Sequence, residues 1–501
     1  MSFVQNVPCF SILAAMFAAI ITSAVKGKAA RWISIGISAA IGVATAFLLA
    51  FLMGTGESYV YVMGHFPAPW GNELRFGMLE AAMALLFCVI MLLALWGGME
   101  EARGDLEEEK ANFYYIMADL MLASNLALVY TNDLFTAYVF VEISTIAACG
   151  LILGKFNDLT IAAGVRYMIM SLMGSGLLLL GISFFYDMTG HLLMSNMKES
   201  ILFLWQTGEY RVPLILTIGL VSVGLAIKSA LWPFHSWLPN AYGHATVSSS
   251  AMLSSIVSKG YIFLLLKIIY RVTGADIFAG SHVIDILLVF GIIGMILGSL
   301  DAVRQKNLRK MIAYSSVAQI GYIFMGMGLG TAAGTGAGIY HIFAHAAAKS
   351  LVFVAAFGLI KASAGNPDIS GLRGAGFRNK VAGVGFVAGS LSMVGIPGFA
   401  GFVSKLMFAE ASLEDAAYAI PVLAALAIST VLNAIYFMRV VLILYTPLSE
   451  EEKAAGQKEQ TMGNPWQFKA AIAGGVALNL FLGICTAPVM GVVQKGLEIF
   501  G

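Results

Sequence analysis

Long apolar stretches recur along the whole chain and alternate with short breaks that are charged or rich in Gly and Pro. Each stretch runs for about 20 residues, the length that an α-helix needs to cross a hydrocarbon core of roughly 30 Å. Apolar runs bounded in this way predict about fourteen membrane-spanning helices, and therefore an all-α polytopic membrane protein. The expected limits are 7–25, 31–53, 77–97, 111–130, 132–153, 161–186, 212–231, 246–272, 281–300, 309–329, 335–361, 381–411, 416–446 and 467–492.

The composition agrees with a membrane protein. Hydrophobic residues make up 59% of the 501 residues and charged residues only 11%, whereas soluble domains carry about 25% charged residues. The sequence contains neither a phosphate-binding loop nor a dinucleotide-binding fingerprint, and no nucleic-acid partner is expected. The four cysteines are scattered through apolar segments without a Cys-x-x-Cys run. We therefore expect no metal and no cofactor in this chain.

Basic residues between the expected spans lie mainly on one side of the membrane. If the N-terminus lies outside and the loops alternate, the inside loops hold 17 Lys and Arg residues. The outside loops hold only five, which are Arg75, Lys198, Arg211, Arg271 and Lys495. A wrong number of spans would scramble this asymmetry, so the positive-inside rule favours fourteen spans with both termini outside. The segment 7–25 follows no basic stretch and is interpreted as the first spanning helix, not as a removed signal.

Several basic residues fall inside or at the edge of the expected spans. They are Lys228, Lys259, Lys267, Lys349, Lys405, Arg439 and Lys469. Lys267 and Lys469 are near helix ends, from which a lysine side chain can reach the interface. A lysine at the centre of a membrane helix costs roughly 2.5–3.5 kcal/mol on insertion scales. The other five therefore require a hydrated interior, acidic partners, or both.

Glu142 is the acidic residue closest to the middle of a span, about ten residues from its start. A lone carboxyl there would stay protonated, whereas a lysine from another helix would favour its ionised form. Lys228 is the natural partner, and a static ion pair that only fixes helix packing is the alternative. Glu80, Asp119 and Asp133 either line an uptake path or cap and pair locally. The acidic run at 99–110 is expected to be a solvated connection, and a docking surface is the alternative.

His341, His345 and Lys349 follow an i, i+4, i+8 spacing, which places all three on one face of a helix, about 6 Å apart per step. Histidine titrates near neutral pH, so this face suits a proton or cation relay. A metal site is the alternative, but the segment has no carboxylate or cysteine at ligand spacing. His235 and His244 lie close to a helix break and are accessory candidates.

Two spans are expected to be broken inside the membrane. The first break is "LWPFHSWLP" (231–239), just after Lys228, and the second is "VGIPGFAGFVSKLMF" (394–408), which contains Lys405. Broken helices in corresponding halves are typical of inverted-repeat transporters, and a packing kink is the alternative. The expected organisation is three N-terminal spans in 1–110, a first repeat in 111–272, a second inverted repeat in 281–446, and a last span at 467–492.

The stretch "GLAIKSALWPFHSWLPNAYGHATVSSSAMLSSIVSKGYIFLLLK" (224–267) resembles the signature of the antiporter-like subunits of respiratory complex I. This family also includes Mrp-type cation/proton antiporters and membrane-bound hydrogenases. The stretches "NLRKMIAYSSVAQIGYIFMGMGLG", "HIFAHAAAKSLVF" and "GIPGFAGFVSKLMF" match further parts of the pattern in the same order. The resemblance covers roughly residues 60–445, and the chain is similar to the shorter members, which lack a long C-terminal lateral helix.

The resemblance implies a proton relay of defined residues. Glu142 matches the glutamate of the fifth span, Lys228 its partner lysine, and Lys259 the lysine of the eighth span. The polar face of the eleventh span matches His341, His345 and Lys349. Lys405 matches the terminal lysine of the twelfth span, where some members have glutamate. A lysine suits such a relay, because burial can shift the pKa of a group by about 3–5 units, whereas arginine effectively never deprotonates.

The expected function is proton translocation, with sodium coupling left open, by the antiporter-like subunit of a redox-driven membrane complex. Such a complex would be an NADH or ferredoxin dehydrogenase, or a membrane-bound hydrogenase, in a prokaryotic cytoplasmic membrane. The alternatives are a subunit of a multisubunit Mrp-type Na⁺/H⁺ antiporter and a structural scaffold. The chain has no catalytic residue of its own in this interpretation. Iron–sulfur, flavin or nickel–iron centres would belong to its partner subunits.

Overall fold

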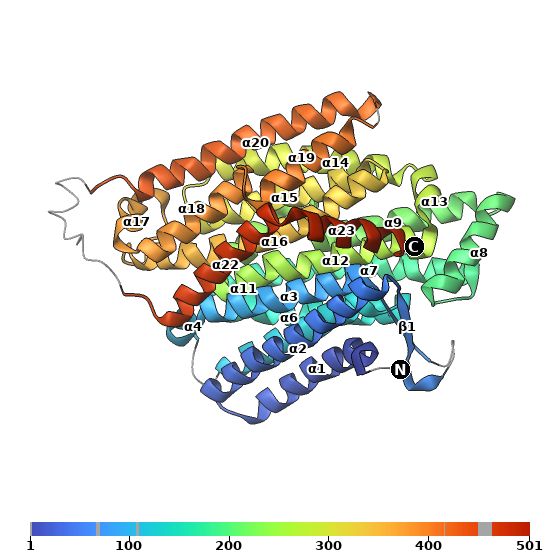
Figure 1. Cartoon of the computed structure of the whole chain (residues 1–501), viewed down its shortest axis with the longest axis horizontal. Coiled ribbons are helices and arrows are strands. Elements are labelled where there is room, and N and C mark those ends of the chain that lie inside the picture. The colour runs from blue at the N-terminus through green and yellow to red at the C-terminus, as the bar shows by residue number, and fades with distance from the viewer. Residues whose placement is uncertain (1–2, 67–70, 107–109, 415, 449–462) are drawn as a thin grey trace.

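The computed structural model describes residues 3–66, 71–106, 110–414, 416–448 and 463–501. Its long helices run side by side along the longest axis of the molecule (Figure 1). Twelve of the described helices are long and apolar enough to cross a membrane. Helix α15 (Leu308–Gly328) and the broken pair α18 (Lys380–Val394) and α19 (Ala400–Ser412) stand where the other two spans were predicted. The expectation of an all-α polytopic fold with about fourteen spans is confirmed.

The helices form four consecutive groups. The N-terminal layer comprises α1 (Val7–Ala24), α2 (Gly27–Thr55) and α3 (Met78–Gly97). The first helix group comprises α5 (Ala111–Tyr130), α6 (Leu134–Leu153), α7 (Asp158–Thr189), α9 (Arg211–Ser229), α10 (Leu238–His244), α11 (Val247–Met252) and α12 (Ser258–Lys267). The second helix group comprises α14 (Val283–Arg304), α15, α16 (Ala332–Lys361), α18, α19 and α20 (Ala416–Leu444). The C-terminal pair comprises α22 (Trp466–Ile484) and α23 (Thr486–Glu498).

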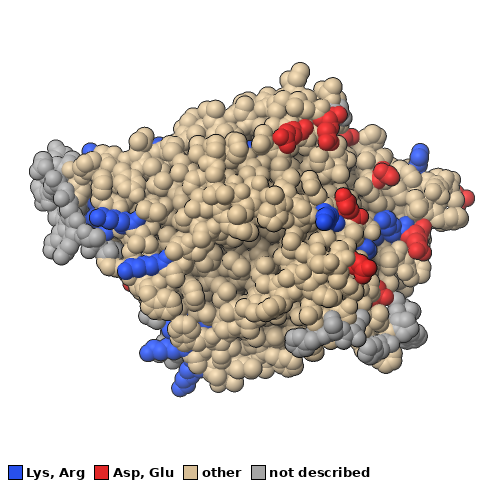
Figure 2. Space-filling model, viewed as in Figure 1, with Lys and Arg blue, Asp and Glu red and all other residues tan. Residues whose placement is uncertain are grey.

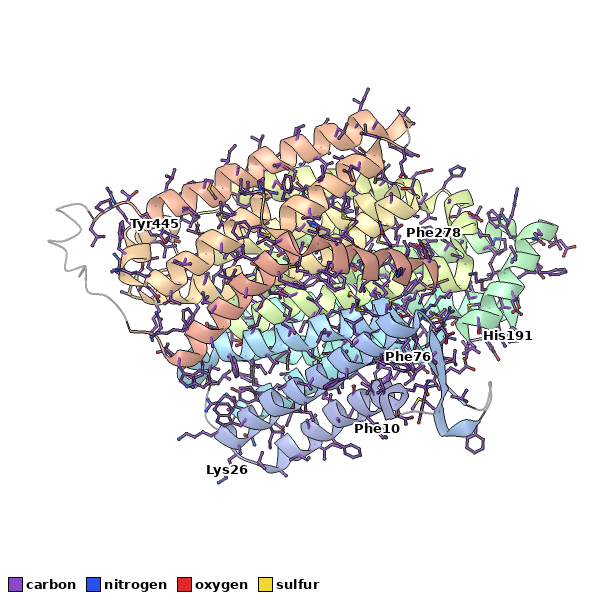
Figure 3. The ribbon with its side chains drawn as sticks, in the orientation of Figure 1. Phe10, Lys26, Phe76, His191, Phe278 and Tyr445 are labelled. Atoms are coloured by element: carbon purple, nitrogen blue, oxygen red, sulfur yellow. The ribbon has the colours of Figure 1, made fainter. Side chains whose placement is uncertain are left out.

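Short elements cover both ends of the bundle. One end carries the antiparallel hairpin of β1 (Tyr59–Val62) and β2 (Glu73–Phe76), together with α8 (Met194–Thr207) and α13 (Ala275–Gly280). The other end carries α4 (Met99–Asp105) and α17 (Ala375–Arg378). We call these the hairpin end and the basic end. Figure 2 shows basic side chains at the basic end, on the left, and acidic side chains beside a few basic ones at the hairpin end. In Figure 3 the hairpin end includes His191 and Phe278, and the basic end includes Lys26 and Tyr445.

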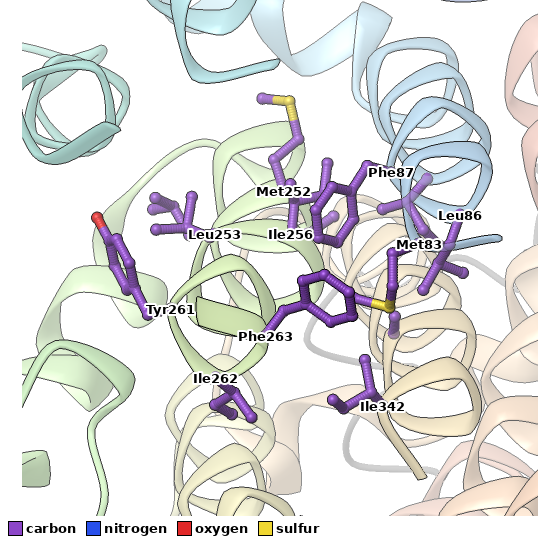
Figure 4. Packing of buried hydrophobic residues seen from close by; sticks show 14 of the residues in the cluster. Met83, Leu86, Phe87, Met252, Leu253, Ile256, Tyr261, Ile262, Phe263 and Ile342 are labelled. Carbon is purple, nitrogen blue, oxygen red and sulfur yellow. The ribbon is translucent and has the colours of Figure 1, made fainter. Parts of the chain in front are cut away.

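The centre of the bundle is formed by α16 and by the segment Val247–Thr273. Every residue in the most apolar stretch of this segment is buried, and so is 94% of the corresponding stretch of α16. Figure 4 shows Phe263 of α12 pointing toward Met83 of α3, with Ile342 of α16 close by. The segment contains two π-helical turns, η4 (Leu253–Val257) and η5 (Ile268–Thr273), a form that occurs mostly at functional sites. Polar residues on these helices are therefore held away from lipid.

Small residues bring neighbouring helices into close contact. A Cβ built on Gly291 of α14 would lie 2.6 Å from the backbone nitrogen of Met325, and one on Gly321 of α15 would lie 2.6 Å from the carbonyl oxygen of Gly291. No side chain fits at either position, so the two backbones pack directly against each other, as small residues allow in membrane bundles.

Both predicted helix breaks are present. Helix α9 ends at Ser229, and Ala230 takes a left-handed conformation with φ of 60°. The chain then forms a short 3-10 turn, η3 (Phe234–Trp237), before α10. Helix α18 ends at Val394, where Gly395 has φ of 89°, and α19 begins only at Ala400. Each break lies next to the lysine that the sequence placed there.

Two expectations from the sequence were wrong. The last span, predicted at 467–492, is interrupted at Cys485 and continues as a separate helix, α23. Lys267 was expected to reach the interface, but its side chain is fully buried beside the end of α5. Helix tilt and the elements that cover a helix end decide such contacts, and neither can be read from one segment. Lys453 and Lys458, counted among the inside basic residues, lie outside the described residues.

Candidate functional site

A buried ion pair stands at the first helix break. The Nζ atom of Lys228, on the last turn of α9, lies 3.8 Å from Oε1 of Glu142 on α6. It also donates hydrogen bonds to the hydroxyls of Thr145 (2.6 Å) and Ser171 (3.1 Å). Lys228 is buried, whereas 26% of the Glu142 side chain is exposed on the flank of the bundle. The pairing that the sequence suggested therefore exists, and two hydroxyls from α6 and α7 surround it.

Lys259 is held by neutral oxygen atoms. Its Nζ donates to the carbonyl oxygen of Ser254 (2.6 Å) and to the hydroxyl of Ser258 (3.2 Å). Ser254 lies in the π-helical turn η4, directly before α12. The ring of Tyr261, two residues further, lies 5.5 Å from Nζ of Lys228. Tyr261 therefore brings an aromatic ring of the same helix as Lys259 close to Lys228.

The polar face of α16 is formed as the spacing predicted. Nζ of Lys349 donates to the carbonyl oxygen of Ile312 (2.7 Å) and to the hydroxyl of Ser315, both on α15. The rings of His341 and His345 lie 6.1 Å apart and nearly parallel, at 14°. Neither ring nitrogen of His345 has a hydrogen-bond partner in the described part of the chain. The described residues include no cluster of three or more His, Cys, Asp or Glu side chains that could hold a metal ion.

Lys405 is connected to this face through an aromatic residue. Its Nζ donates to the carbonyl oxygen of Val394 (2.7 Å), where α18 breaks, and to the hydroxyl of Thr430 (3.1 Å). It also lies 5.4 Å from the ring of Tyr322, which stacks on His341 at 5.3 Å. His341 shares a hydrogen bond of 2.9 Å with Ser404, the residue before Lys405. The structure thus joins α16 to the second helix break.

The accessory candidates lie around this chain of polar groups. Asp119 accepts hydrogen bonds from Thr22 (3.2 Å) and Ser34 (2.9 Å), which join α5 to the N-terminal layer. Asp133 caps α6, because its carboxylate accepts the backbone N–H of Thr136 at 2.7 Å. The remaining three are placed as follows: His235 lies in η3, His244 lines a cavity at the basic end, and Glu80 pairs with Arg271.

The acidic run was misjudged where the structure describes it. Glu101 is buried, and its carboxylate lies 2.9 Å from Nζ of Lys155 and 3.7 Å from Nη1 of Arg309. Glu100 pairs with Lys361 at the end of α16. These groups line a cavity of about 860 Å³ at the basic end, between the two helix groups. The start of the run is therefore part of a polar cavity, and residues 107–109 lie outside the described residues.

Sequence reasoning missed the hydroxyl and aromatic partners, because Thr145, Ser171, Tyr322 and Thr430 are ordinary helix residues in the sequence. The sequence contained one weak indication of Tyr322. It lies in a segment that already matched the family pattern, 307–330, but nothing in that segment indicates which side chain faces His341.

Comparisons with known proteins agree on one family. Residues 131–432 match the family model described as "NADH:quinone oxidoreductase/Mrp antiporter, TM". The chain is 34% identical to NADH-quinone oxidoreductase subunit N of Desulforudis audaxviator, over 79% of this chain and 77% of that protein. It is 26% identical to a Na(+)/H(+) antiporter subunit of Bacillus subtilis, over 92% of this chain and 90% of that protein. A chain of the membrane-bound sulfane sulfur reductase, an archaeal respiratory membrane complex, shares the fold with a TM-score of 0.87. This match has 23% identity over 99% of this chain and 97% of that chain.

Proposed function

The chain belongs to the NADH:quinone oxidoreductase/Mrp antiporter transmembrane family, and we propose that it conducts protons through the polar groups from Glu142 to Lys405. It would do so as the ion-translocating subunit of a redox-driven membrane complex. The observation that carries the proposal is the Glu142–Lys228 pair at a helix break, 3.8 Å apart and surrounded by hydroxyls. In transporters, substrate and coupling-ion sites are typically formed by discontinuous helices.

Lysine is the residue type that this role requires. Lys228, Lys259 and Lys349 each donate to hydroxyl or carbonyl oxygens. Both kinds of oxygen accept hydrogen bonds from an ammonium group. Only the hydroxyls can also donate a hydrogen bond to the neutral amine that remains when the proton leaves. A buried lysine can release its proton, whereas arginine effectively never does. Loss of the nearby Glu142 charge would favour that release at Lys228. The proton would then pass along α12 and α16 and leave near Lys405.

We place the basic end inside the cell, following the positive-inside rule. The cavity between Glu101 and His244 then opens to the inside and supplies protons to the first helix group. A second cavity, of about 550 Å³, lies at the hairpin end between α16, α19 and α23. Glu410, Glu414 and Glu498 line it, close to Lys405 along α19, and it would receive the released ion outside.

Partner subunits of a multisubunit membrane complex are supported by two partly exposed charged side chains. Part of the Glu142 side chain is exposed at membrane depth, and Lys405 is only partly buried. Lipid contact is unfavourable for either group. Neighbouring membrane subunits would cover them, as expected for a chain similar to subunits of respiratory and antiporter complexes. The energy for transport would come from those partners, because this chain shows no redox motif.

A subunit of a multisubunit Na⁺/H⁺ antiporter is the second candidate. The similarity to the Bacillus subtilis antiporter protein extends over 92% of this chain, more than the 79% covered by the Desulforudis audaxviator relative, although at lower identity. A scaffold role, in which the buried charges only specify assembly, is the third. The coupling ion distinguishes the first two, and ion flux after loss of Lys228 distinguishes the third.

The test compares Lys228→Ala and Lys228→Arg in the assembled complex, in sealed vesicles, with pH and sodium gradients followed while the partner reaction runs. The proposal expects both variants to assemble and to lose ion movement, because Lys228 must change its protonation state. Transport restored by arginine would mean that a fixed charge is sufficient, and the relay would be wrong. Transport that survives in both variants would support the scaffold role. Sodium movement without partner redox chemistry would favour the antiporter.

A further inference from the structure

One face of the central helix carries positive charge beyond the proposed relay. Lys259, Phe263, Lys267 and Arg271 are spaced four residues apart and therefore follow one side of α12 and η5 toward the hairpin end. Lys259 belongs to the relay proposed above. A proton that reached Lys259 could in principle continue along this face to the hairpin end without entering the second helix group. Protons must pass through the second helix group only if the hairpin end of α12 is closed to them.

Lys267 is buried and bound to backbone carbonyls. Its Nζ donates to the carbonyl oxygens of Leu128 (3.1 Å), Val129 (3.0 Å) and Thr131 at the end of α5. These carbonyls have no partners within their own helix, and the negative end of the helix dipole favours a cation there. No carboxylate lies within ion-pair distance of Lys267 in the described part of the chain. The site therefore stabilises the ammonium form without offering an acceptor that could carry a proton onward.

Arg271 holds an aromatic ring over the end of this face. Its guanidinium pairs with Glu80, and its Nε donates to the carbonyl oxygen of Phe500 at 2.7 Å. The Phe500 ring lies 4.4 Å from the guanidinium carbon and 5.4 Å from the ring of Phe263. Only 1% of Phe500 is exposed. The C-terminal segment after α23 thus covers the hairpin end of α12 with an apolar side chain.

Two more basic side chains surround the same segment. Arg75 of β2 donates to the carbonyl oxygens of Ile499 and Gly501, each at 3.2 Å. Burial, together with the charges of Arg75 and Arg271, lowers the pKa of Lys198 on α8. Arg75, Lys198, Lys267 and Arg271 are therefore four basic side chains near this end of α12, and Glu80 pairs with one of them, Arg271.

The hairpin end of the second helix group has the opposite character. There a cavity of about 550 Å³ is lined by Glu410, Glu414 and Glu498. Carboxylates attract cations, whereas fixed positive charges in a pore raise the barrier to protons and other cations. The carboxylates of this cavity thus contrast with the basic side chains beside α12, and Tyr270 of η5, next to Arg271, borders the cavity on the side of the first helix group.

We propose that Lys267, Arg271 and Phe500 form a cation-excluding seal at the hairpin end of the first helix group. The seal rests on the proposed transport function and adds a role to it: protons that reach Lys259 can leave only through α16 and Lys405. Lys267 contributes a positive charge that three carbonyl oxygens at the end of α5 bind, and Phe500 covers the end of this face with an apolar side chain. Neither residue carries the transported proton.

The experiment measures passive proton leak in sealed vesicles that contain the assembled complex, without the driving reaction, after a potassium diffusion potential is imposed. Lys267→Met keeps the length of the side chain but removes the charge, and we expect leak to rise on the order of tenfold, which corresponds to about 1.4 kcal/mol of barrier. Lys267→Arg keeps a permanent charge and should show wild-type leak and full driven transport. Phe500→Ala keeps every charge and should leak more than the wild type. Arg211→Met removes an exposed basic residue from the same end and is the matched control.

Leak in Lys267→Met and Phe500→Ala no higher than in Arg211→Met would overturn the seal. Loss of driven transport in Lys267→Arg would also overturn it, because Lys267 would then have to change protonation state. If Lys267→Met does not assemble, Phe500→Ala decides, since it leaves the buried charges in place. The Lys228→Arg variant tests the proposed function separately, because it leaves the seal intact. Driven transport that survives in this variant would contradict the proposed function and not the seal.

Discussion

Lys228 is on the last turn of α9, before the first helix break, whereas Lys405 is five residues into α19, after the second. Lys228 has a carboxylate at 3.8 Å and two hydroxyl acceptors. Lys405 has a carbonyl oxygen at 2.7 Å and a hydroxyl at 3.1 Å, and no carboxylate within ion-pair distance in the described residues. The two breaks hold the same side chain by different means.

The difference indicates that the two sites would have different roles in transport. An ammonium group beside a carboxylate is stabilised as long as the partner stays ionised and close. A change at Glu142 therefore changes the charge state of Lys228, so this site can act as a switch. The neutral oxygens around Lys405 cannot be switched by a proton of their own. In the proposed relay, Lys405 would instead receive its proton from the side of His341 and Tyr322, whose rings lie next to each other and to Lys405.

Replacing each lysine with glutamate should give the largest contrast. Lys228→Glu places a second carboxyl group beside that of Glu142, and like charges that close cannot both ionise. We expect driven transport to fall by more than about a hundredfold. Lys405→Glu lies near neutral oxygen atoms, the carbonyls of Met393 and Val394 and the hydroxyl of Thr430, to which a protonated carboxyl can donate. We expect that variant to keep transport within about tenfold of the wild type, measured as pH change in energised vesicles.

Assembly of both variants has to be checked on native gels, so that lost transport is not lost complex. Equal loss in the two variants would remove the distinction between the sites. A larger loss at Lys405 would reverse it, and the switch would then belong to the second break.

The second break should be the less tolerant of added volume. A Cβ built on Gly401 would lie 1.8 Å from the carbonyl oxygen of Ser392, the end of the preceding helix. Gly401→Ala therefore forces the two halves of the broken helix apart, and we expect it to destabilise the protein by about 1–3 kcal/mol. Gly176→Ala on α7 meets nothing within 4 Å and is the control. Thermal denaturation in detergent measures both, and equal melting temperatures would show that the second break has room to adjust.

Much of this comparison could be predicted from the sequence, because helix breaks and intramembrane charge are local signals. Pro233 with its neighbours, and the glycines at 395–401, indicated both breaks, and the buried lysines beside them stood out by their cost in the membrane. The spacing of His341, His345 and Lys349 was sufficient to predict one polar face. These features depend on residues within a few turns of each other.

The parts that failed depend on contacts between distant segments. Lys267 resembles any lysine near a helix end, and only the position of the end of α5 makes it a buried cap. Glu101 appears in an acidic run, but it pairs with Lys155, which follows α6, and with Arg309 on the first turn of α15. The partners of Lys405, Val394 and Thr430, depend on how α18, α19 and α20 pack, which sequence spacing does not specify.

Removing the charge of Glu142 tests whether the first break is a switch. Glu142→Gln leaves Lys228 its hydroxyl partners and a neutral amide of the same shape, so the pair loses only its charge. We expect driven transport to fall by roughly tenfold, less than in Lys228→Glu, because Lys228 itself remains. Thr430→Val, which removes a neutral acceptor from Lys405, is the counterpart at the second break and should cost less. Transport unchanged in Glu142→Gln would mean that the ionised pair is structural.

The backbone of the first break should give the smallest effect, since opposing contributions nearly cancel there. Ala230 is buried and left-handed, with φ of 60°, a conformation that costs an alanine about 1 kcal/mol and a glycine little. Ala230→Gly relieves this strain, but it removes a buried methyl group worth about 0.8 kcal/mol and makes the unfolded chain more flexible by about 0.4–1 kcal/mol. We therefore expect a change of stability below about 1 kcal/mol and wild-type transport, because the substitution alters no charged or hydrogen-bonding side chain. Gly395→Ala is the matched change at the second break, where φ is 89° and the new Cβ would lie 2.9 Å from Cδ of Lys405. It should impair both stability and transport.

A large loss of transport in Ala230→Gly would mean that the left-handed alanine itself positions Lys228, and the first break would then be as sensitive to its backbone as the second.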